Sequence, residues 1–271
     1  MPRILTADLD LELGGSVDLI LQIAAARTVP FASEDLSFRI DGDDLPVREI
    51  VDQAGSRIHR LTGRAGTLEV RYRAVVDDDR AAASAPASAL DEITYLRPSR
   101  YAQSDEVFAH ARRQFRGLHG HGLVEAVSDF VASRTTYTPG HSLGTDSAVT
   151  TLASAQGVCR DYAHLVIALL RAMDVPARYV ACYAPGLVPM DFHAVAEAWV
   201  DGAWHVIDAT RLADRRALVR IATGRDAADC AFLSYYGGNV SLRTLRVDAR
   251  WADAAAVPSD RDDHLAAVHI P

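Results

Sequence analysis

The spacing of the apolar residues changes along this chain, and that change constrains the fold more than any other feature. Residues 1–78 contain runs with strand composition or alternation, separated by glycine and aspartate. These runs are LDLELG, VDLILQIA, LSFRID and LEVRYRAVV. After Tyr95 the apolar residues recur at helical spacing, and several strand-like runs follow Pro176. This order of elements predicts an α+β protein.

Composition supports a division of the chain into parts. Residues 79–94 begin with acids and continue with alanine, serine and proline, which is typical of a linker. We therefore expect a β-rich N-terminal domain over 1–78, a linker over 79–94, and a larger α+β domain over 95–255. The tail over 256–271 should be loosely held.

Local patterns give more detailed expectations. Residues 57–76 resemble a β-hairpin whose turn falls near Gly63 to Gly66. Helices are expected over 104–115, with Ser104 as the capping residue, and over 122–137. A third, shorter helix is expected over 145–156.

Charge and hydropathy exclude some functions. The 271 residues have a formal net charge of −8 and no long basic run, so binding to nucleic acid is not expected. No apolar run approaches the roughly 18 residues of a membrane span. The first residues carry acids where a signal peptide needs a basic start. We expect a cytoplasmic protein that does not act at a membrane, and its oligomeric state is left open.

Cys159 occupies an unusual position for a cysteine. The apolar residues from Val158 to Met173 recur at helical spacing, and Pro176 ends the helix. Cys159 therefore lies in the first turn, where backbone N–H groups lack partners within the helix. The positive end of the helix dipole favours a thiolate there, and the free N–H groups could hold an oxyanion. The other two cysteines, Cys182 and Cys230, lie in apolar runs and are expected to be buried.

A cysteine at this position could also serve only for packing, since free cysteine is often buried. A nucleophile needs a base and a group that orients the base. In the segment HAVAEAWVDGAWHVID, residues 193–208, Asp201-Gly202 predicts a two-residue hairpin turn. That turn places Trp199 opposite Trp204, and it brings His193 and Asp208 to one face as diagonal neighbours.

Several motifs in this order resemble the transglutaminase-like superfamily, and its bacterial cysteine peptidases in particular. They cover roughly residues 95–235. The motifs are YTPG from Tyr137, Ser147-Ala148, GVCRDYAHL, LLRAMDVPARYV, DFHAVAEAWVDGAWHVIDAT and GRDAADCAF. The β-rich N-terminal region fits the β domain that often precedes the catalytic domain in this group.

The resemblance implies a papain/transglutaminase-like catalytic domain with three catalytic residues. Cys159 matches the nucleophile, His193 the general base and Asp208 the orienting acid. The expected substrate is a peptide or protein amide, cleaved or transferred through a thioester, with hydrolysis favoured over transamidation. Cys159 would supply one oxyanion donor through its N–H group, and Gln156 and Tyr137 are candidates for the second. The sequence has Val195 where the family commonly has tryptophan, which could reshape the wall of the site.

Two other functions remain open at this stage. One is an arylamine N-acetyltransferase-like acyl transfer, which uses the same three residue types and would depend on acetyl-coenzyme A. The other is a non-catalytic interaction module on the same fold, in which Cys159 would be unreactive. No zinc-like ligand spacing and no dinucleotide or phosphate-loop glycine pattern occurs, so no cofactor or metal is expected.

The remaining polar and aromatic candidates have structural interpretations. Glu197 is expected to pair with an arginine such as Arg160 or Arg178. The Trp199–Trp204 pair is expected in the core, and the run from His119 to Gly122 is expected to be an exposed turn.

Overall fold

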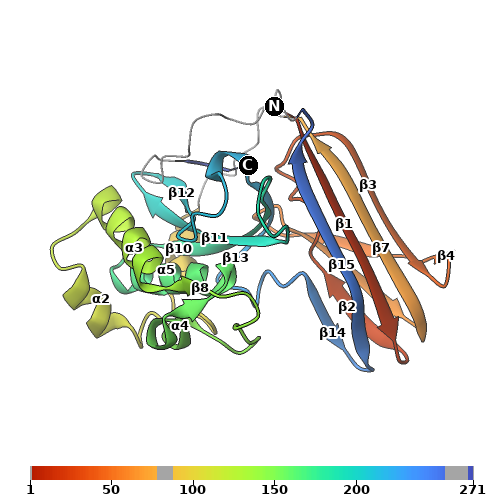
Figure 1. Cartoon of the computed structure of the whole chain (residues 1–271), viewed down its shortest axis with the longest axis horizontal. Coiled ribbons are helices and arrows are strands. Elements are labelled where there is room, and N and C mark those ends of the chain that lie inside the picture. The colour runs from red at the N-terminus through yellow and green to blue at the C-terminus, as the bar shows by residue number, and fades with distance from the viewer. Residues whose placement is uncertain (1, 78–87, 254–267, 271) are drawn as a thin grey trace.

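The computed structural model describes residues 2–77, 88–253 and 268–270. Figure 1 shows a β-sandwich on one side of the molecule, and a sheet covered by helices on the other. The order of elements is that of an α+β protein, as the sequence predicts.

The sandwich contains two antiparallel sheets. The first has the strand order β15-β1-β7-β3-β4, and the second has the order β14-β2-β6-β5. The strands of the first sheet are β1 (Arg3–Leu13), β3 (Phe31–Ile40), β4 (Asp43–Asp44), β7 (Gly66–Val76) and β15 (Val240–Trp251). Those of the second are β2 (Val17–Leu21), β5 (Arg48–Val51), β6 (Arg57–Gly63) and β14 (Leu233–Tyr236). Every second residue of β1 is fully buried, from Leu5 to Leu13, so its alternation marks the face that packs inside the sandwich.

The hairpin expected over 57–76 is wrong. β6 pairs with β2 and β5, whereas β7 pairs with β1 and β3, so the chain crosses from one sheet to the other between them. A Cβ atom at Gly63 would lie 2.5 Å from Cδ1 of Leu13, so a larger residue at this crossing would require the end of the Leu13 side chain to move. Alternation identifies the buried face of a strand, but it does not identify the partner strand.

The second half of the molecule is a four-stranded antiparallel sheet with helices packed on it. Its strand order is β12-β11-β10-β13. These strands are β10 (Ala177–Tyr183), β11 (His193–Val200), β12 (Ala203–Ile207) and β13 (Val219–Gly224), and the 3₁₀ turn η1 (Arg215–Ala217) precedes β13. The helices are α1 (Ala89–Leu96), α2 (Phe108–Gln114), α3 (Gly120–Arg134), α4 (Ala148–Ser154) and α5 (Cys159–Ala172). A short parallel pair, β8 (Thr136–Tyr137) and β9 (Gln156–Gly157), lies beside the start of α5.

Helix α5 is the central element of this half. It packs on β11 and against α3 and α4, and every residue from Asp161 to Ala172 is buried. Such a helix is apolar on most of its surface because no side of it reaches solvent.

Two helix expectations and part of the linker expectation need correction. The helix predicted over 104–115 begins only after Val107, and Ser104 is buried in the preceding turn and does not cap it. The helix predicted over 122–137 spans Gly120 to Arg134, and the two residues of β8 follow it. Residues 89–94 of the expected linker belong to α1, which begins there because Ser88 and Asp91 form a capping box. The rest of that linker lies outside the described residues.

The last described strands return to the N-terminal sheets. β14 pairs with β2, and β15 pairs with β1 along its length, although both strands fall within the domain expected over 95–255. The two N-terminal sheets therefore include strands from outside residues 1–78, the range expected for the N-terminal domain. Of the tail expected to be loose, residues 268–270 lie against β12, where the Val206 N–H donates to the Val268 carbonyl at 2.9 Å.

The two halves share one continuous core. The rings of Tyr72 and Tyr183 stack with their centroids 6.0 Å apart, and the Tyr183 hydroxyl donates to the Ile23 carbonyl at 2.8 Å. Buried Arg3 donates to the Ala217 carbonyl at 2.9 Å. In the part of the chain that the structure describes, none of the helices has the length and apolar character of a membrane span.

Candidate active site

Cys159 is the first residue of α5, as the sequence predicts. The carboxylate of Asp161 accepts a hydrogen bond from the Val158 N–H at 2.8 Å, which satisfies one donor before the first turn. The thiol is free and only partly buried, whereas Cys182 and Cys230 are buried as expected. Burial raises the pKa of both buried thiols well above the ordinary value. Cys159 is therefore the most accessible thiol of the protein.

Gly157 positions the chain just before the nucleophile. It pairs with Tyr137 in the short parallel ladder. A Cβ atom at Gly157 would lie 2.6 Å from the Cβ of Asp161, closer than real Cβ atoms approach other atoms. Only glycine lets this backbone pass so close to the buried Asp161 side chain, which explains the residue in physical terms.

His193 and Asp208 meet as the hairpin register predicts. The observed pairs Trp199–Trp204 and Glu197–Val206 are those that the Asp201-Gly202 turn requires. His193 Nε2 lies 2.8 Å from Asp208 Oδ2, and both side chains are fully buried. The other carboxylate oxygen of Asp208 accepts bonds from the Thr210 N–H at 3.0 Å and from its hydroxyl at 2.6 Å. Sequence analysis missed Thr210, although a threonine two residues after an aspartate is a common turn pattern.

The second ring nitrogen of His193 differs from the first, because no described residue holds it by a hydrogen bond. Nδ1 of His193 is buried and has no hydrogen-bond partner among the residues that the structure describes. Since Nε2 is held by Asp208, Nδ1 is the nitrogen that can exchange a proton with a neighbouring group. Cys159 is such a neighbour, because it lines the same cleft and its thiol helps to raise the pKa of His193.

Electrostatics favour a charged imidazolium. Burial alone would lower the pKa of His193, but the charge and hydrogen bond of Asp208, together with the Cys159 thiol, raise it to about 10. Burial opposes ionisation of Asp208 too, yet His193 and Thr210 hold its pKa below the ordinary value. The two side chains therefore carry opposite charges over the neutral pH range.

The Tyr137 phenol also lies beside the nucleophile. Burial raises its pKa, as does the nearby Cys159 thiol, while a hydrogen bond with the Cys159 backbone opposes the rise. Gln156, the other candidate for a second oxyanion donor, is exposed, and its amide oxygen lies 3.5 Å from the Thr138 hydroxyl. Of the two candidates, the structure brings only Tyr137 to Cys159.

Cys159 and His193 line a cleft of about 690 Å³. Part of its wall comes from the helix-covered sheet, and part comes from the β-sandwich side through Gln22, Leu233 and Leu245. Most of the lining is apolar. A cleft of this size and character can hold a short stretch of peptide or a comparable small molecule.

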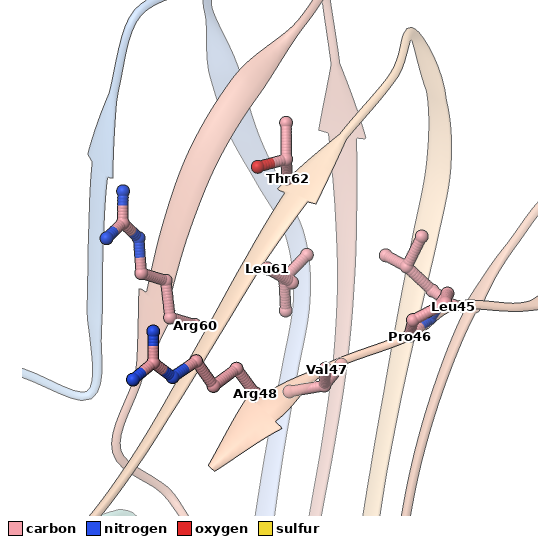
Figure 2. A pocket seen from close by; sticks show the side chains of 7 residues that line it. All are labelled: Leu45, Pro46, Val47, Arg48, Arg60, Leu61 and Thr62. Atoms are coloured by element: carbon pink, nitrogen blue, oxygen red, sulfur yellow. The ribbon is translucent and has the colours of Figure 1, made fainter. Parts of the chain in front are cut away.

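A second hollow, of about 580 Å³, lies on the β-sandwich. It is lined by Leu45, Pro46, Val47, Arg48, Arg60, Leu61 and Thr62 (Figure 2). Arg48 and Arg60 face each other across β5 and β6. Asp18 binds both Arg60, at 3.3 Å, and the Thr62 hydroxyl, at 2.6 Å. The lining brings no thiol and imidazole together, so we place the candidate active site in the first cleft.

Glu197 has the structural role that the sequence predicts. It accepts from Arg178 at 2.7 Å and also from Arg220 at 2.6 Å, a partner that no local sequence signal indicated. Arg160, the alternative partner, instead donates to carbonyl groups of the loop from Ser142 to Asp146.

Val195 does not line the cleft. It packs with Val180 and Val206 in a small apolar cluster, on the opposite face of the sheet from the alanines that pack towards α5. A change of size at this position therefore acts on packing and does not reshape the wall of the site.

The Trp199–Trp204 pair and the run from His119 to Gly122 differ in part from what the sequence predicts. The rings of Trp199 and Trp204 are 5.3 Å apart, with Trp204 buried and Trp199 partly exposed. The run from His119 to Gly122 is exposed, but it forms the start of α3 and not a turn between helices. In the described ranges no group of three or more His, Cys, Asp or Glu side chains could hold a metal ion.

Known proteins resemble this chain in sequence and in fold. Residues 111–209 match the family model of the transglutaminase-like superfamily. The crystal structure of a "putative cysteine protease" from Cytophaga hutchinsonii is 34% identical and has a TM-score of 0.84, with 93% of this chain and 91% of that chain covered. An uncharacterised protein of Mycobacterium leprae is 30% identical over 154 residues, 52% of this chain and 53% of that protein. This chain thus matches about half the length of the curated mycobacterial relative.

The matched region contains the cysteine helix and the hairpin that carries the histidine and the aspartate. The likeness to the Cytophaga protein extends over the β-sandwich as well, since it covers nearly the whole chain. The chain belongs to the transglutaminase-like superfamily.

Proposed function

We propose that the protein is a cysteine-dependent amidase that hydrolyses peptide or protein amide bonds. The observation that carries this proposal is the state of the His193 imidazole. One nitrogen is fixed by Asp208, and the other is buried, unpartnered among the described residues and in the same cleft as the Cys159 thiol. That is the arrangement a general base needs beside a nucleophile.

The proposed reaction begins at the thiol. In the resting site Nδ1 of His193 already holds the proton of Cys159, and the thiolate sulfur attacks the carbonyl carbon of the amide. The Cys159 N–H at the start of α5 stabilises the resulting oxyanion, and the Tyr137 hydroxyl is the second donor. His193 then gives its proton to the leaving nitrogen, and the C–N bond breaks to leave a thioester.

Water completes the cycle. His193 removes a proton from a water molecule as the oxygen attacks the thioester carbonyl. The C–S bond breaks, the acyl group leaves as a carboxylic acid, and the thiol is regenerated. Asp208 stays ionised throughout and stabilises the imidazolium, which its hydrogen bond also orients.

The first test is the alkylation of Cys159 by iodoacetamide as a function of pH, located by peptide mass spectrometry. In the native protein, Cys159 should be alkylated rapidly at neutral pH. The reason is that the His193 imidazolium, whose pKa is about 10, stabilises the thiolate. His193→Ala should slow the reaction about tenfold or more at that pH.

Cys159→Ser is the control that assigns the modification, because Cys182 and Cys230 are buried. A Cys159 that resists alkylation in the native protein, or that reacts equally well in His193→Ala, would contradict the proposal and favour a non-catalytic module. Release of new carboxyl groups from a peptide mixture, absent with Cys159→Ser, would establish hydrolysis.

A further inference from the structure

Asp191 and Arg160, which both line the cleft, differ in their hydrogen-bond and ion-pair partners. Asp191 is the only acidic side chain in the described lining, and it stands two residues before His193. One of its oxygens accepts the Phe192 N–H at 2.7 Å, and no ion pair with a described residue satisfies its charge. Asp191 is exposed at the surface, yet partial burial raises its pKa, opposed only by the Phe192 N–H.

Arg160, the one arginine among the described residues that line the cleft, is not available to Asp191. The guanidinium of Arg160 donates to the carbonyls of Leu143, Gly144 and Asp146, and it also approaches Asp161. Its charge is thus used to hold the loop beside the cleft. Asp191 forms no ion pair with a described residue, so it is free to pair with a cationic group of the substrate.

The surroundings of Asp191 suit a long side chain with a charged end. The rings of Phe192 and Phe232 lie 5.6 Å apart, and both line the cleft with Ile221, Leu233 and Leu245. Lysine and arginine bury their aliphatic stems on apolar surface while the charged end reaches a polar group. Aromatic faces attract such cations as well.

We propose that the cleft selects amide substrates with a lysine or arginine side chain next to the scissile bond, and that Asp191 binds its charged end. This inference rests on the proposed amidase function and names its substrate class. Asp191 acts here as a specificity residue. It takes no part in the chemical step, which belongs to Cys159 and His193.

The test compares matched fluorogenic peptides that differ at one position. Lysine is replaced by norleucine, and arginine by citrulline, on each side of the scissile amide in turn. In the native protein, kcat/KM should be about 2- to 5-fold higher for the charged member of a pair at one of the two sides, as expected for an ion pair at an exposed carboxylate.

Substitution of Asp191 should change the preference selectively. Asp191→Asn retains an acceptor for the Phe192 N–H, and it should reduce the lysine-to-norleucine ratio of kcat/KM to near unity. Asp191→Glu should restore part of the ratio, because it restores the charge. Asp105→Asn, an equal change of charge at an exposed position outside the cleft, should leave the ratio unchanged.

The outcomes separate this inference from the proposed function. If the native protein cleaves both members of each pair equally well, or Asp191→Asn lowers both equally, the assignment of Asp191 is wrong and the amidase function stands. If no peptide is cleaved and Cys159 is unreactive, the amidase function itself fails.

Discussion

At the residue scale, the structure distinguishes between the two candidates for the second oxyanion donor and places the phenol of Tyr137 beside Cys159. It reaches the nucleophile because β8 pairs with β9, which ends two residues before Cys159. Its hydroxyl lies beside both groups of Cys159 that matter in the proposed reaction, the thiol and the backbone N–H. A hydroxyl there can donate to an oxyanion that forms on the substrate.

Tyr137→Phe should therefore lower kcat for a cleaved peptide by about 10²- to 10³-fold, the usual cost of losing one oxyanion donor. KM should change little, and Cys159 should still be alkylated at the native rate, because His193 and Asp208 are untouched. Steady-state kinetics and the alkylation assay make the two measurements. An unchanged kcat would remove Tyr137 from the mechanism.

Cys159, His193 and Asp208 could be identified as candidates from the sequence because each lies in a motif with a local cause. Cys159 begins an apolar helix, and His193 and Asp208 are linked by the register of one tight turn. Tyr137 could be proposed only as one of two options, since a two-residue strand leaves no periodic pattern. Asp191 was missed because its importance depends on which distant residues line the cleft.

At the scale of the element, the buried charges of β11 are a stabilising device separate from the site. Glu197 is almost fully buried and held by Arg178 and Arg220. Burial opposes its ionisation, but the two arginines lower its pKa to about 2. Because the pKa in the folded protein lies below its ordinary value of 4.5, this contribution to stability is present above that value and is lost as the pH falls towards 2.

Glu197→Gln leaves Arg178 and Arg220 without their counter-ion in the interior. The free energy of unfolding at neutral pH should fall by about 3 kcal/mol, as is usual when one partner of a buried ion pair is removed. Urea denaturation monitored by tryptophan fluorescence would measure it. The difference from the native protein should shrink as the pH falls below 4, and a constant difference would show that the charge of Glu197 is not its cause.

Two hairpin predictions had opposite outcomes for a physical reason. Asp201 and Gly202 both have positive φ, 51° and 81°, so the tight turn itself fixes the pairing of β11 with β12. Gly63 and Gly66 instead lie where the chain crosses from the sheet of β6 to the sheet of β7. Glycine marks an unusual backbone path in both places, and only the two-residue turn dictates which strands pair.

At the scale of the whole molecule, the sandwich depends on strands from both ends of the described chain. β14 pairs with β2 and β15 pairs with β1, so the two sheets of the sandwich are completed by late strands. Leu233 of β14 and Leu245 of β15 also line the candidate cleft. The order of strands and helices could be read from the sequence. The return of β15 to β1 could not, because pairing between distant segments leaves no local signal.

The fragment 95–255 should therefore fail to fold by itself. It retains β14 and β15 but lacks the strands with which they pair, so it leaves unpaired sheet edges and apolar side chains in solvent. Circular dichroism melting and size-exclusion chromatography should show aggregates without cooperative unfolding, and mixing with the separate fragment 2–77 should restore a soluble complex. A monomeric fragment with a cooperative melt would contradict this expectation.

The pairing of β1 with β15 also has a consequence for biosynthesis. While the ribosome makes the chain, β1 emerges early, and the strand that covers one of its edges emerges only after the helices and the central sheet. Contacts between such distant segments close slowly, and an uncovered strand edge attracts other chains in the meantime. Translation that stops before residue 240 thus leaves a product with an open edge and an incomplete cleft, and synthesis through β15 is needed to cover that edge and to complete the lining of the candidate active site.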